Sequence, residues 1–287
     1  MTESARLLVH VDLDNGWIYR DEHGEGCVAA SVDIYEQAVP TLLEQFDAAG
    51  IQATFFVVAQ DLAESMFAPE VLKQAIASGH SIGNHTYSHD PHFLNMPRQE
   101  KMAEIARADA LIRSTLAVEP EGFRAPGYAV SDGYLALLAD LGYSYDSSVL
   151  PGPATSMLEA YFKLVLRSDK HFPMFFSPNQ RRAVKASRSD FQISRVPQIP
   201  ICTTRFLRMP VHSAFVANKS DEQLLRMIRS AARARSRSVY LLHGIDLAWQ
   251  HDPASSVRVL RKPLAHRLDT IAKVLAQVRL LNEAASQ

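Results

Sequence analysis

Residues 6–16 read RLLVHVDLDNG, and this stretch decides the fold. Its first six residues form an apolar run with β-branched members, which is typical of a buried strand. The run ends in two carboxylates, Asp12 and Asp14, followed by Asn15 and Gly16. In parallel α/β folds, functional groups gather at the carboxyl ends of the strands. The stretch therefore predicts a buried strand that presents acidic groups at the functional edge of a parallel sheet.

Strand-like and helix-like segments alternate along the chain from this stretch onward. Pro40 lies inside the first helical segment, which leaves a helix start at Pro40 as an alternative. Repeated alternation predicts parallel βα units, in a barrel or a doubly wound sheet. The expected strands cover 6–11, 51–58, 80–84, 122–124, 143–145 and 238–243, and the expected helices cover 33–49, 69–78, 97–117, 132–140 and 263–281.

The composition fits one α/β domain over residues 1–287. The chain is 47% hydrophobic, which is ample for a buried core. The alternation fails between about 150 and 212, a stretch that holds seven prolines, so we expect a long irregular insertion there. Cys27 and Cys202 are the only cysteines, which excludes an all-cysteine zinc site or a disulfide framework.

Charge is spread unevenly although the net charge is only -1. Residues 151–240 hold 16 Lys+Arg and 5 Asp+Glu, which leaves 14 basic and 26 acidic residues elsewhere. This basic stretch predicts an anionic partner: a phosphate group, an anionic membrane surface or, less favoured, nucleic acid. A solvated basic face without a partner is the equal alternative. No nucleic-acid-binding motif is present, so we expect no nucleic acid.

The first residues lack a basic segment followed by an apolar one, so we expect no signal peptide. The expected location is the cytoplasm, with peripheral contact at the inner face of the membrane through 151–240 as a further hypothesis.

Each predicted strand end carries an ionisable group, and the sharpest signal is His85 with His89. A spacing of four predicts both imidazoles on one face of a helical turn, so both can reach one ion. Two histidines and one carboxylate form a three-ligand set with open positions, as in hydrolytic zinc sites. Taken alone, two histidines at this spacing are more often an ordinary helix face than a ligand pair. However, a turn does not explain two buried carboxylates at Asp12 and Asp14, because unpaired buried charge is costly.

Two further strand ends bear single charged or titratable groups. Arg124 precedes Ala-Pro-Gly, a rigid turn in which an arginine would most naturally pair with a carboxylate. His243 follows the apolar run at 239–242, where a core histidine is the common alternative to a functional one.

These motifs, in this order, resemble the NodB-homology polysaccharide deacetylases, which are carbohydrate esterase family 4. The resemblance spans about 6–150 and 238–280 and does not cover the insertion. It implies a distorted (β/α) barrel and a divalent metal, most commonly Zn²⁺, with Co²⁺, Ni²⁺ or Mn²⁺ as alternatives. The motifs that carry it are Asp12-Leu13-Asp14-Asn15-Gly16, His85-Thr86-Tyr87-Ser88-His89, Arg124-Ala125-Pro126-Gly127, Asp146-Ser147-Ser148 and Leu242-His243.

The resemblance also implies a role for each matched residue. Asp14, His85 and His89 would bind the metal. Asp12 would be the general base, and Arg124 would hold it in place and keep it ionised.

On the opposite side of the reaction, His243 would be the general acid that protonates the departing amine, tuned by Asp146. The backbone N–H of Gly127 would share the oxyanion with the metal. The family's first motif usually has adjacent aspartates, whereas Leu13 separates them here. A register with Asp14 as the base and Asn15 as a ligand is therefore an alternative.

The implied function is metal-dependent hydrolysis of an N-acyl group, acetyl or formyl, from an amino sugar. The Asp-x-Asp form, the absent signal and the basic stretch resemble the cytoplasmic branch that includes the deformylase of undecaprenyl-phosphate-linked 4-formamido-arabinose. The hypothesis that follows is a phosphate-linked substrate, carried on a lipid or a nucleotide. Two alternatives remain: a non-haem iron oxygenase using the same ligand set, and a non-catalytic sugar-binding module.

Overall fold

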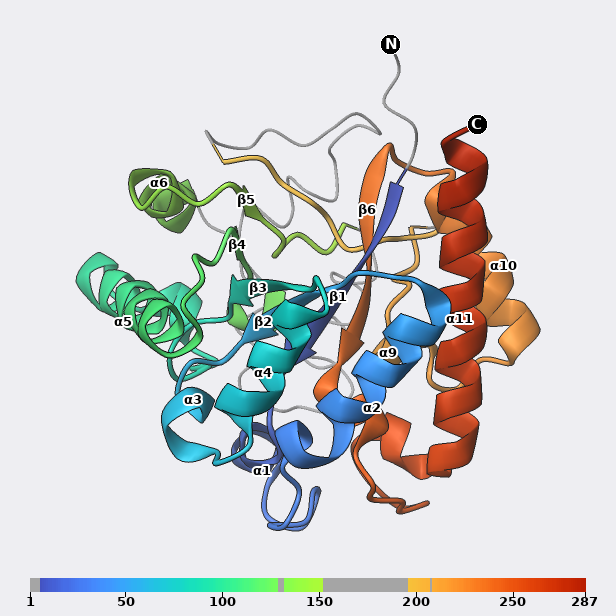
Figure 1. Cartoon of the computed structure of the whole chain (residues 1–287), viewed down its shortest axis with the longest axis horizontal. Coiled ribbons are helices and arrows are strands. Elements are labelled where there is room, and N and C mark those ends of the chain that lie inside the picture. Colours follow the sequence, from blue (N-terminus) through green and yellow to red (C-terminus); the bar gives the residue numbers. More distant parts are fainter. Residues whose placement is uncertain (1–5, 129–131, 152–195, 207) are drawn as a thin grey trace, which may run out of the picture.

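The computed structural model describes residues 6–128, 132–151, 196–206 and 208–287. Within them, one six-stranded parallel sheet runs through the centre of the molecule in the order β5-β4-β3-β2-β1-β6 (Figure 1). Its strands match the six expected from the sequence. They are β1 (Arg6–Leu13), β2 (Thr54–Val57), β3 (Ser81–Asn84), β4 (Gly122–Phe123), β5 (Tyr145–Asp146) and β6 (Arg237–His243).

Residues 196–202 connect the two edges of this sheet. The backbone N–H of Ile199 donates to the carbonyl of Asp146 in β5 at 2.8 Å, and that of Cys202 donates to Val239 in β6 at 2.8 Å. Both segments run parallel to their neighbours. The sheet therefore curls into an irregular barrel, and the predicted α/β class with a distorted (β/α) barrel is confirmed. The remainder of the predicted insertion at 150–212 lies largely outside the described residues, because 152–195 are not among them.

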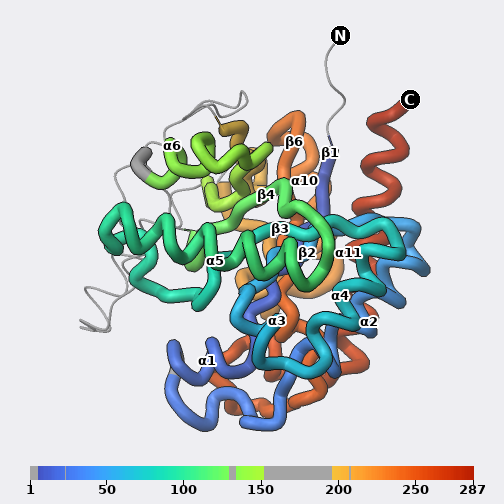
Figure 2. The backbone as a smooth tube through the Cα atoms, turned by 60° about the vertical axis from the view of Figure 1, so that its left-hand side comes forward, coloured from blue at the N-terminus to red at the C-terminus, as the bar shows by residue number. Residues whose placement is uncertain are grey.

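Helices cover the outside of the barrel, and six of them pack in the spatial order α10, α11, α2, α4, α5, α6 (Figure 2). The helices are α1 (Gly16–His23), α2 (Ile34–Ala49), α3 (Asp61–Glu64), α4 (Ala68–Ala77), α5 (Arg98–Leu116), α6 (Asp132–Asp140), α9 (Ser213–Val216), α10 (Asp221–Ala232) and α11 (Leu264–Ala285). Short 3₁₀ turns are η1 (Phe93–Asn95), η2 (Pro126–Tyr128), η4 (Gly244–Leu247) and η5 (Arg258–Arg261).

Local capping explains where α2 begins and ends. The Asp33 side chain accepts a hydrogen bond from the Tyr35 N–H, which satisfies a free donor of the first turn. Gly50 ends the helix with φ 63, a left-handed conformation that costs glycine little. Pro40 lies inside the helix. The alternative start at Pro40 is therefore wrong: the first turns of α2 are capped by Asp33, and they bury Ile34, Tyr35 and Val39 in the core.

Side chains of β1 alternate between two apolar layers. Val9 and Val11 face the helices and belong to the large core between sheet and helices. Leu8 packs instead with Val239 and Leu241 inside the barrel. Because strand side chains alternate in direction, Asp12 shares the interior face with Leu8. The two expected core thiols, Cys27 and Cys202, are both buried and free. Among the described residues, no helix combines the length and apolar character needed to cross a membrane.

Candidate active site

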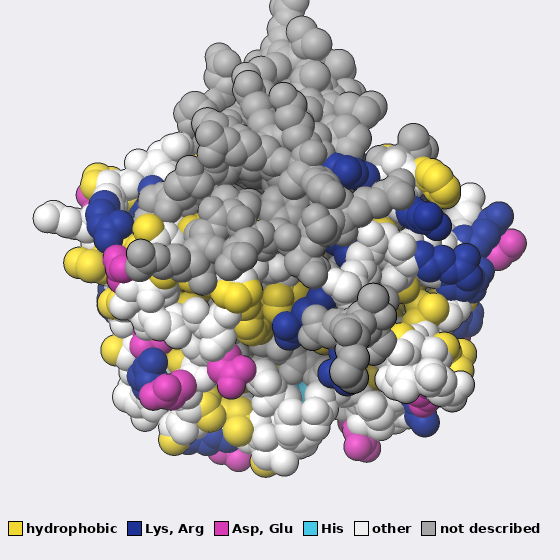
Figure 3. Space-filling model, turned by 90° about the horizontal axis from the view of Figure 1, so that it is seen from above, with side chains coloured by type: hydrophobic (Ala, Val, Ile, Leu, Met, Phe, Trp, Pro, Cys, Tyr) yellow, Lys and Arg dark blue, Asp and Glu magenta, His cyan; other side chains and the backbone are white. Residues whose placement is uncertain are grey.

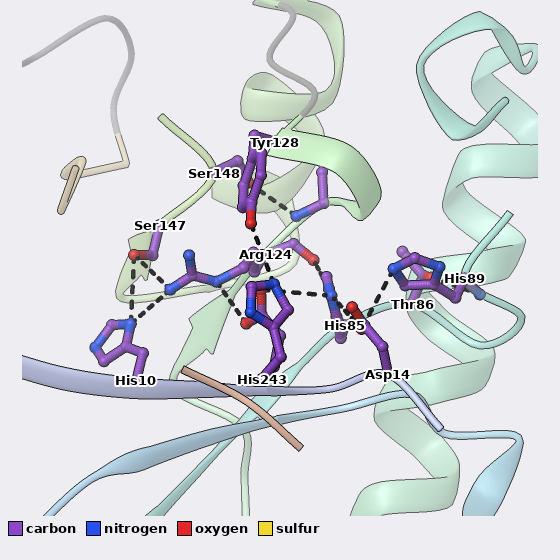
Figure 4. Close-up of polar contacts among 12 residues, drawn as sticks. His10, Asp14, His85, Thr86, His89, Arg124, Tyr128, Ser147, Ser148 and His243 are labelled. Atoms are coloured by element: carbon purple, nitrogen blue, oxygen red, sulfur yellow. Dashed lines mark hydrogen bonds and ion pairs between the residues drawn. The ribbon is translucent and has the colours of Figure 1, made fainter. Parts of the chain in front are cut away.

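The polar residues singled out from the sequence meet where the strands end (Figure 4). Asp12 belongs to β1, and Asp14 lies just beyond it. His85 follows β3, Arg124 follows β4, and His243 is the last residue of β6. Parallel strands bring their carboxyl ends to one edge, so residues more than 200 positions apart become neighbours.

Asp14, His85 and His89 offer three ligand atoms that lie within 4.8 Å of one another. The Asp14 Oδ1 atom is 3.3 Å from His85 Nε2 and 3.4 Å from His89 Nε2. The same Oδ1 atom is buried and has no hydrogen-bond partner. A buried carboxylate oxygen facing two ring nitrogens is costly without a cation between them. The set of two imidazoles and one carboxylate therefore fits a divalent metal such as zinc.

The tautomer of His85 supports this fit. Its Nδ1 lies 2.7 Å from the carbonyl oxygen of Arg124, which can only accept. Nδ1 therefore carries the proton, and Nε2 presents its lone pair toward Asp14. Burial alone would raise the pKa of Asp14, but the neighbouring His89 and His85 hold it below its ordinary value. Asp14 is thus anionic, as a carboxylate that could hold a metal ion must be.

The turn from His85 to His89 is not helical, so that part of the prediction is wrong. Thr86 and His89 both have left-handed backbones, with φ of 68 and 52. Glu104 of α5 accepts a hydrogen bond from the Ser88 N–H at 2.9 Å, which fixes the turn from outside. The two rings nevertheless converge, with centroids 4.9 Å apart. Left-handed residues of this kind cost energy and concentrate at functional sites.

Asp12 and Arg124 form a buried ion pair, with Nε 2.9 Å from Oδ1. Arg124 also donates through Nη2 to His10 Nδ1 at 2.7 Å and to Ser147 Oγ at 3.1 Å. Burial lowers the pKa of His10, with the Arg124 charge acting in the same direction, so His10 is a neutral acceptor. Burial raises the pKa of Asp12, whereas Arg124 opposes that rise. The pair leaves Asp12 Oδ2 3.9 Å from His85 Nε2, next to the metal ligands.

His243 lies beside Asp12 on the neighbouring strand β6 and has three polar neighbours. Its Nε2 is 3.2 Å from the Tyr128 hydroxyl, and its Nδ1 is 3.3 Å from the Ser213 hydroxyl. Its backbone N–H donates to Asp246 Oδ2 at 2.8 Å. The imidazole is therefore positioned through its ring nitrogens by hydroxyl groups.

The structure does not bring Asp146 to His243, which corrects the implied tuning of one by the other. Asp146 accepts hydrogen bonds from the Tyr134 hydroxyl at 3.1 Å and from the Ser148 hydroxyl at 2.6 Å. Burial raises the pKa of Asp146 to about 6, although these donors oppose the rise. Asp246 is the aspartate beside His243.

The alternative register at the first motif is wrong, because Asn15 is occupied elsewhere. Its Oδ1 accepts from the backbone N–H groups of Gly16 at 2.7 Å and Ile34 at 3.1 Å. Asn15 therefore joins the starts of α1 and α2 and has no free oxygen for a metal. Gly127 lies in η2 with φ 59, directly before Tyr128. The role of its N–H at the oxyanion stays a prediction.

Sequence reasoning missed several residues of this site. His10 shares the inward face of β1 with Asp12, so the two-residue period of a strand could have found it. Asp246 was visible as the ionisable residue that follows β6. The contributions of Tyr128 and Ser213 had no sequence signal, because each reaches His243 from a distant segment.

Comparisons with known proteins find deacetylases both by sequence and by fold. Residues 20–145 match the family model described as polysaccharide deacetylase. Chitin deacetylase 1 of Cryptococcus neoformans is 34% identical over 103 residues, covering 36% of this chain and 21% of that protein. The peptidoglycan deacetylase of Helicobacter pylori is 27% identical over 144 residues, covering 50% of this chain and 48% of that one. The chain thus spans less than half the length of these curated relatives.

Two solved structures share the fold over nearly the whole chain. A proposed polysaccharide deacetylase from Mycobacterium smegmatis has a TM-score of 0.60 at 17% identity, covering 96% of this chain and 85% of that one. A family 4 carbohydrate esterase pseudoenzyme from Bacillus anthracis has a TM-score of 0.51 at 13% identity, covering 96% and 62%. At these identities the likeness shows the fold alone.

Proposed function

Because the chain belongs to the polysaccharide deacetylase family, we propose that it is a metal-dependent hydrolase that removes an N-acyl group from an amino sugar. The observation that carries the proposal is the arrangement of three groups at one edge of the barrel. The ligand set of Asp14, His85 and His89 lies beside Asp12, which is ion-paired with Arg124. His243, the register partner of Asp12 on the neighbouring strand, lies in the same group of side chains.

Each residue has a chemical task that amide hydrolysis requires. When bound, a divalent ion would supply Lewis-acid polarisation of the acyl carbonyl and make water more acidic. Asp12 accepts the proton of the attacking water, and burial makes this carboxylate a stronger base than an exposed aspartate. His243 donates a proton from Nε2 to the departing amine nitrogen, because amine is a poor leaving group. Tyr128 must yield that nitrogen, since its hydroxyl is hydrogen-bonded there.

The presence of both a base and an acid favours an enzyme over a sugar-binding module. The test is mass spectrometry of N-acetylglucosamine oligomers and of acetylated and formylated amino-sugar phosphates incubated with the protein. We expect loss of the acyl group, abolished by a chelator and restored by Zn²⁺, Co²⁺, Ni²⁺ or Mn²⁺. Asp12→Asn should bind metal but not hydrolyse. Metal binding without hydrolysis in the unmodified protein would instead place it with the pseudoenzymes. Product formation that requires O₂ would favour the oxygenase alternative.

A basic groove favours an anionic partner and supports the phosphate-linked substrate. It is a surface hollow of about 310 Å³ lined by Arg205, Phe206, Arg226, Arg229, Ser230 and Arg233. Figure 3 shows lysine and arginine side chains gathered on the side where α10 lies in Figure 1. Phe206 is 81% exposed at its edge. Clustered guanidinium groups beside an exposed aromatic ring match the phosphate layer of an anionic membrane. We therefore include in the proposal that this groove contacts an anionic membrane surface and that the protein is located in the cytoplasm.

Vesicle binding tests this contact separately from the chemistry. We expect sedimentation with vesicles that contain phosphatidylglycerol, not with pure phosphatidylcholine, and release by high salt. Arg226→Glu with Arg233→Glu should abolish sedimentation, whereas Arg258→Glu on η5 should not. Equal binding by both variants would reject the groove as the contact, while leaving the hydrolase proposal untouched.

A further inference from the structure

We propose that Glu22 of α1 is a positioning residue that accepts a hydrogen bond from His89 Nδ1 and thereby orients this imidazole toward the metal. The inference rests on the metal role proposed for His89. Glu22 Oε1 lies 3.8 Å from His89 Nδ1. The other ring nitrogen, Nε2, lies 3.4 Å from Asp14 Oδ1. The ring of His89 therefore stands between a ligand carboxylate and a second carboxylate.

Both facing atoms are buried polar groups without a hydrogen bond. Glu22 Oε1 and His89 Nδ1 are each buried, and neither has a hydrogen-bond partner among the residues that the structure describes. Two buried polar groups that face each other without a hydrogen bond destabilise the folded protein. At 3.8 Å the pair is too long for a hydrogen bond. A small rotation of the glutamate or the imidazole would close the gap and satisfy both atoms at once.

His85 has the hydrogen bond on its outer ring nitrogen that His89 lacks. His85 donates through Nδ1 to the carbonyl of Arg124 at 2.7 Å, which fixes its ring and tautomer. A metal-ligating histidine usually has such an acceptor on its outer nitrogen, and a carboxylate is a common choice. Among the described residues, Glu22 is the carboxylate that lies at His89 Nδ1. The two imidazoles would then be held by different acceptors, one a backbone carbonyl and one a side chain.

The geometry also separates Glu22 from the ligands themselves. The atoms that lie within 4.8 Å of one another come from Asp14, His85 and His89, and Glu22 is outside this set. It approaches the nitrogen that faces away from Asp14, so it acts on the metal through His89. Loss of such an acceptor typically lowers metal affinity by 10–100-fold.

Zinc affinity, measured by competition with a chromophoric chelator, tests the proposal without any substrate. We expect Glu22→Ala to weaken Zn²⁺ binding by about 10–100-fold. Glu22→Gln should lose less, because its amide oxygen can still accept from Nδ1. Asp21→Asn is the matched control, because Asp21 is the exposed neighbour on the same helix. It should bind Zn²⁺ as the unmodified protein does.

Two further measurements separate the positioning of His89 from a purely structural role of Glu22. The metal-free urea midpoint of Glu22→Ala should equal or exceed that of the unmodified protein, because the variant removes a buried carboxylate that lacks a partner. Visible spectra of the Co²⁺-loaded protein should shift in Glu22→Ala but not in Asp21→Asn. Unchanged Zn²⁺ affinity in Glu22→Ala would overturn the inference. An unmodified protein that binds no Zn²⁺ would instead overturn the proposed function, on which this inference depends.

Discussion

Replacement of the buried Arg124 with methionine tests how the Asp12 carboxylate is held in the folded protein. The change leaves Asp12 as a buried carboxylate without its ion pair, which costs about 3–5 kcal/mol. His10 and Ser147 also lose a hydrogen bond from the guanidinium, at about 1 kcal/mol each. We therefore expect Arg124→Met to lower the free energy of unfolding by about 5–7 kcal/mol. Urea denaturation of the metal-free protein measures this change.

Two further variants decide whether the loss comes from the orphaned charge. Asp12→Asn combined with Arg124→Met removes both charges, so it should be about 2–3 kcal/mol more stable than Arg124→Met alone. Arg113→Met is the surface control, because Arg113 also pairs with two carboxylates, of Asp109 and Glu119. Its side chain is 41% exposed, against 0% for Arg124, so it should cost at most about 1 kcal/mol. Equal losses in Arg113→Met and Arg124→Met, or no recovery in the double variant, would refute the reasoning.

Three other outcomes follow from local features. Burial raises the pKa of Asp146 from 3.8 to about 6 in the folded protein. The folded protein is therefore about 3 kcal/mol more stable below pH 3.8, where Asp146 is protonated, than well above pH 6. This stability is lost as the pH rises through the folded-state pKa. Asp146→Asn should flatten that part of the curve of urea midpoint against pH, and an unchanged slope would contradict it. Ala117 ends α5 with φ 57, so Ala117→Gly should stabilise the protein by about 1 kcal/mol. Ala106→Gly, inside the same helix, should destabilise it by about as much. Thermal denaturation measures both changes, and a change of the same sign in the two variants would contradict the prediction. Ser213→Ala removes the hydroxyl beside His243 Nδ1, so kcat should fall roughly 5- to 10-fold with little change in KM. A rise in KM with kcat unchanged would show instead that Ser213 acts on substrate binding.

The strands and the acidic end of β1 were predictable because their signals are local. A run of apolar residues must be buried on both faces, and the polar residues that end it must then lie at a sheet edge. The alternation along β1 places Asp12 on the interior face, where Leu8 packs inside the barrel. Helix ends were predictable where a cap is encoded, as at Gly50. The capping box at α10, formed by Ser220 and Gln223, carried the same kind of signal and was overlooked.

The backbone between the two histidines was not predictable, because it depends on contacts from other elements. A spacing of four suits a helical turn, yet Thr86 and His89 adopt left-handed conformations that a helix excludes. Glu104 of α5 stabilises this conformation through the Ser88 N–H. The sequence shows neither the left-handed backbone of Thr86 and His89 nor the Glu104 hydrogen bond that stabilises it. The convergence of the two imidazole rings was predicted from a helical turn, and the structure has no helical turn there.

Asp146 and Asp246 show why a residue type at a strand end does not reveal its partner. Asp146 ends β5 and Asp246 follows β6, the two edge strands of the sheet, and both aspartates are buried. Asp146 pairs through its backbone with residues on both sides of Gln198, at the place where the barrel closes, while its side chain accepts from the Ser148 hydroxyl. That hydroxyl in turn accepts from the Ala125 N–H at 2.8 Å, so Asp146 fixes the turn that follows Arg124 to the closing segment. Asp246, three residues after His243, reaches the His243 backbone instead. Asp146 thus stabilises the segment that closes the barrel, whereas Asp246 holds the backbone of His243.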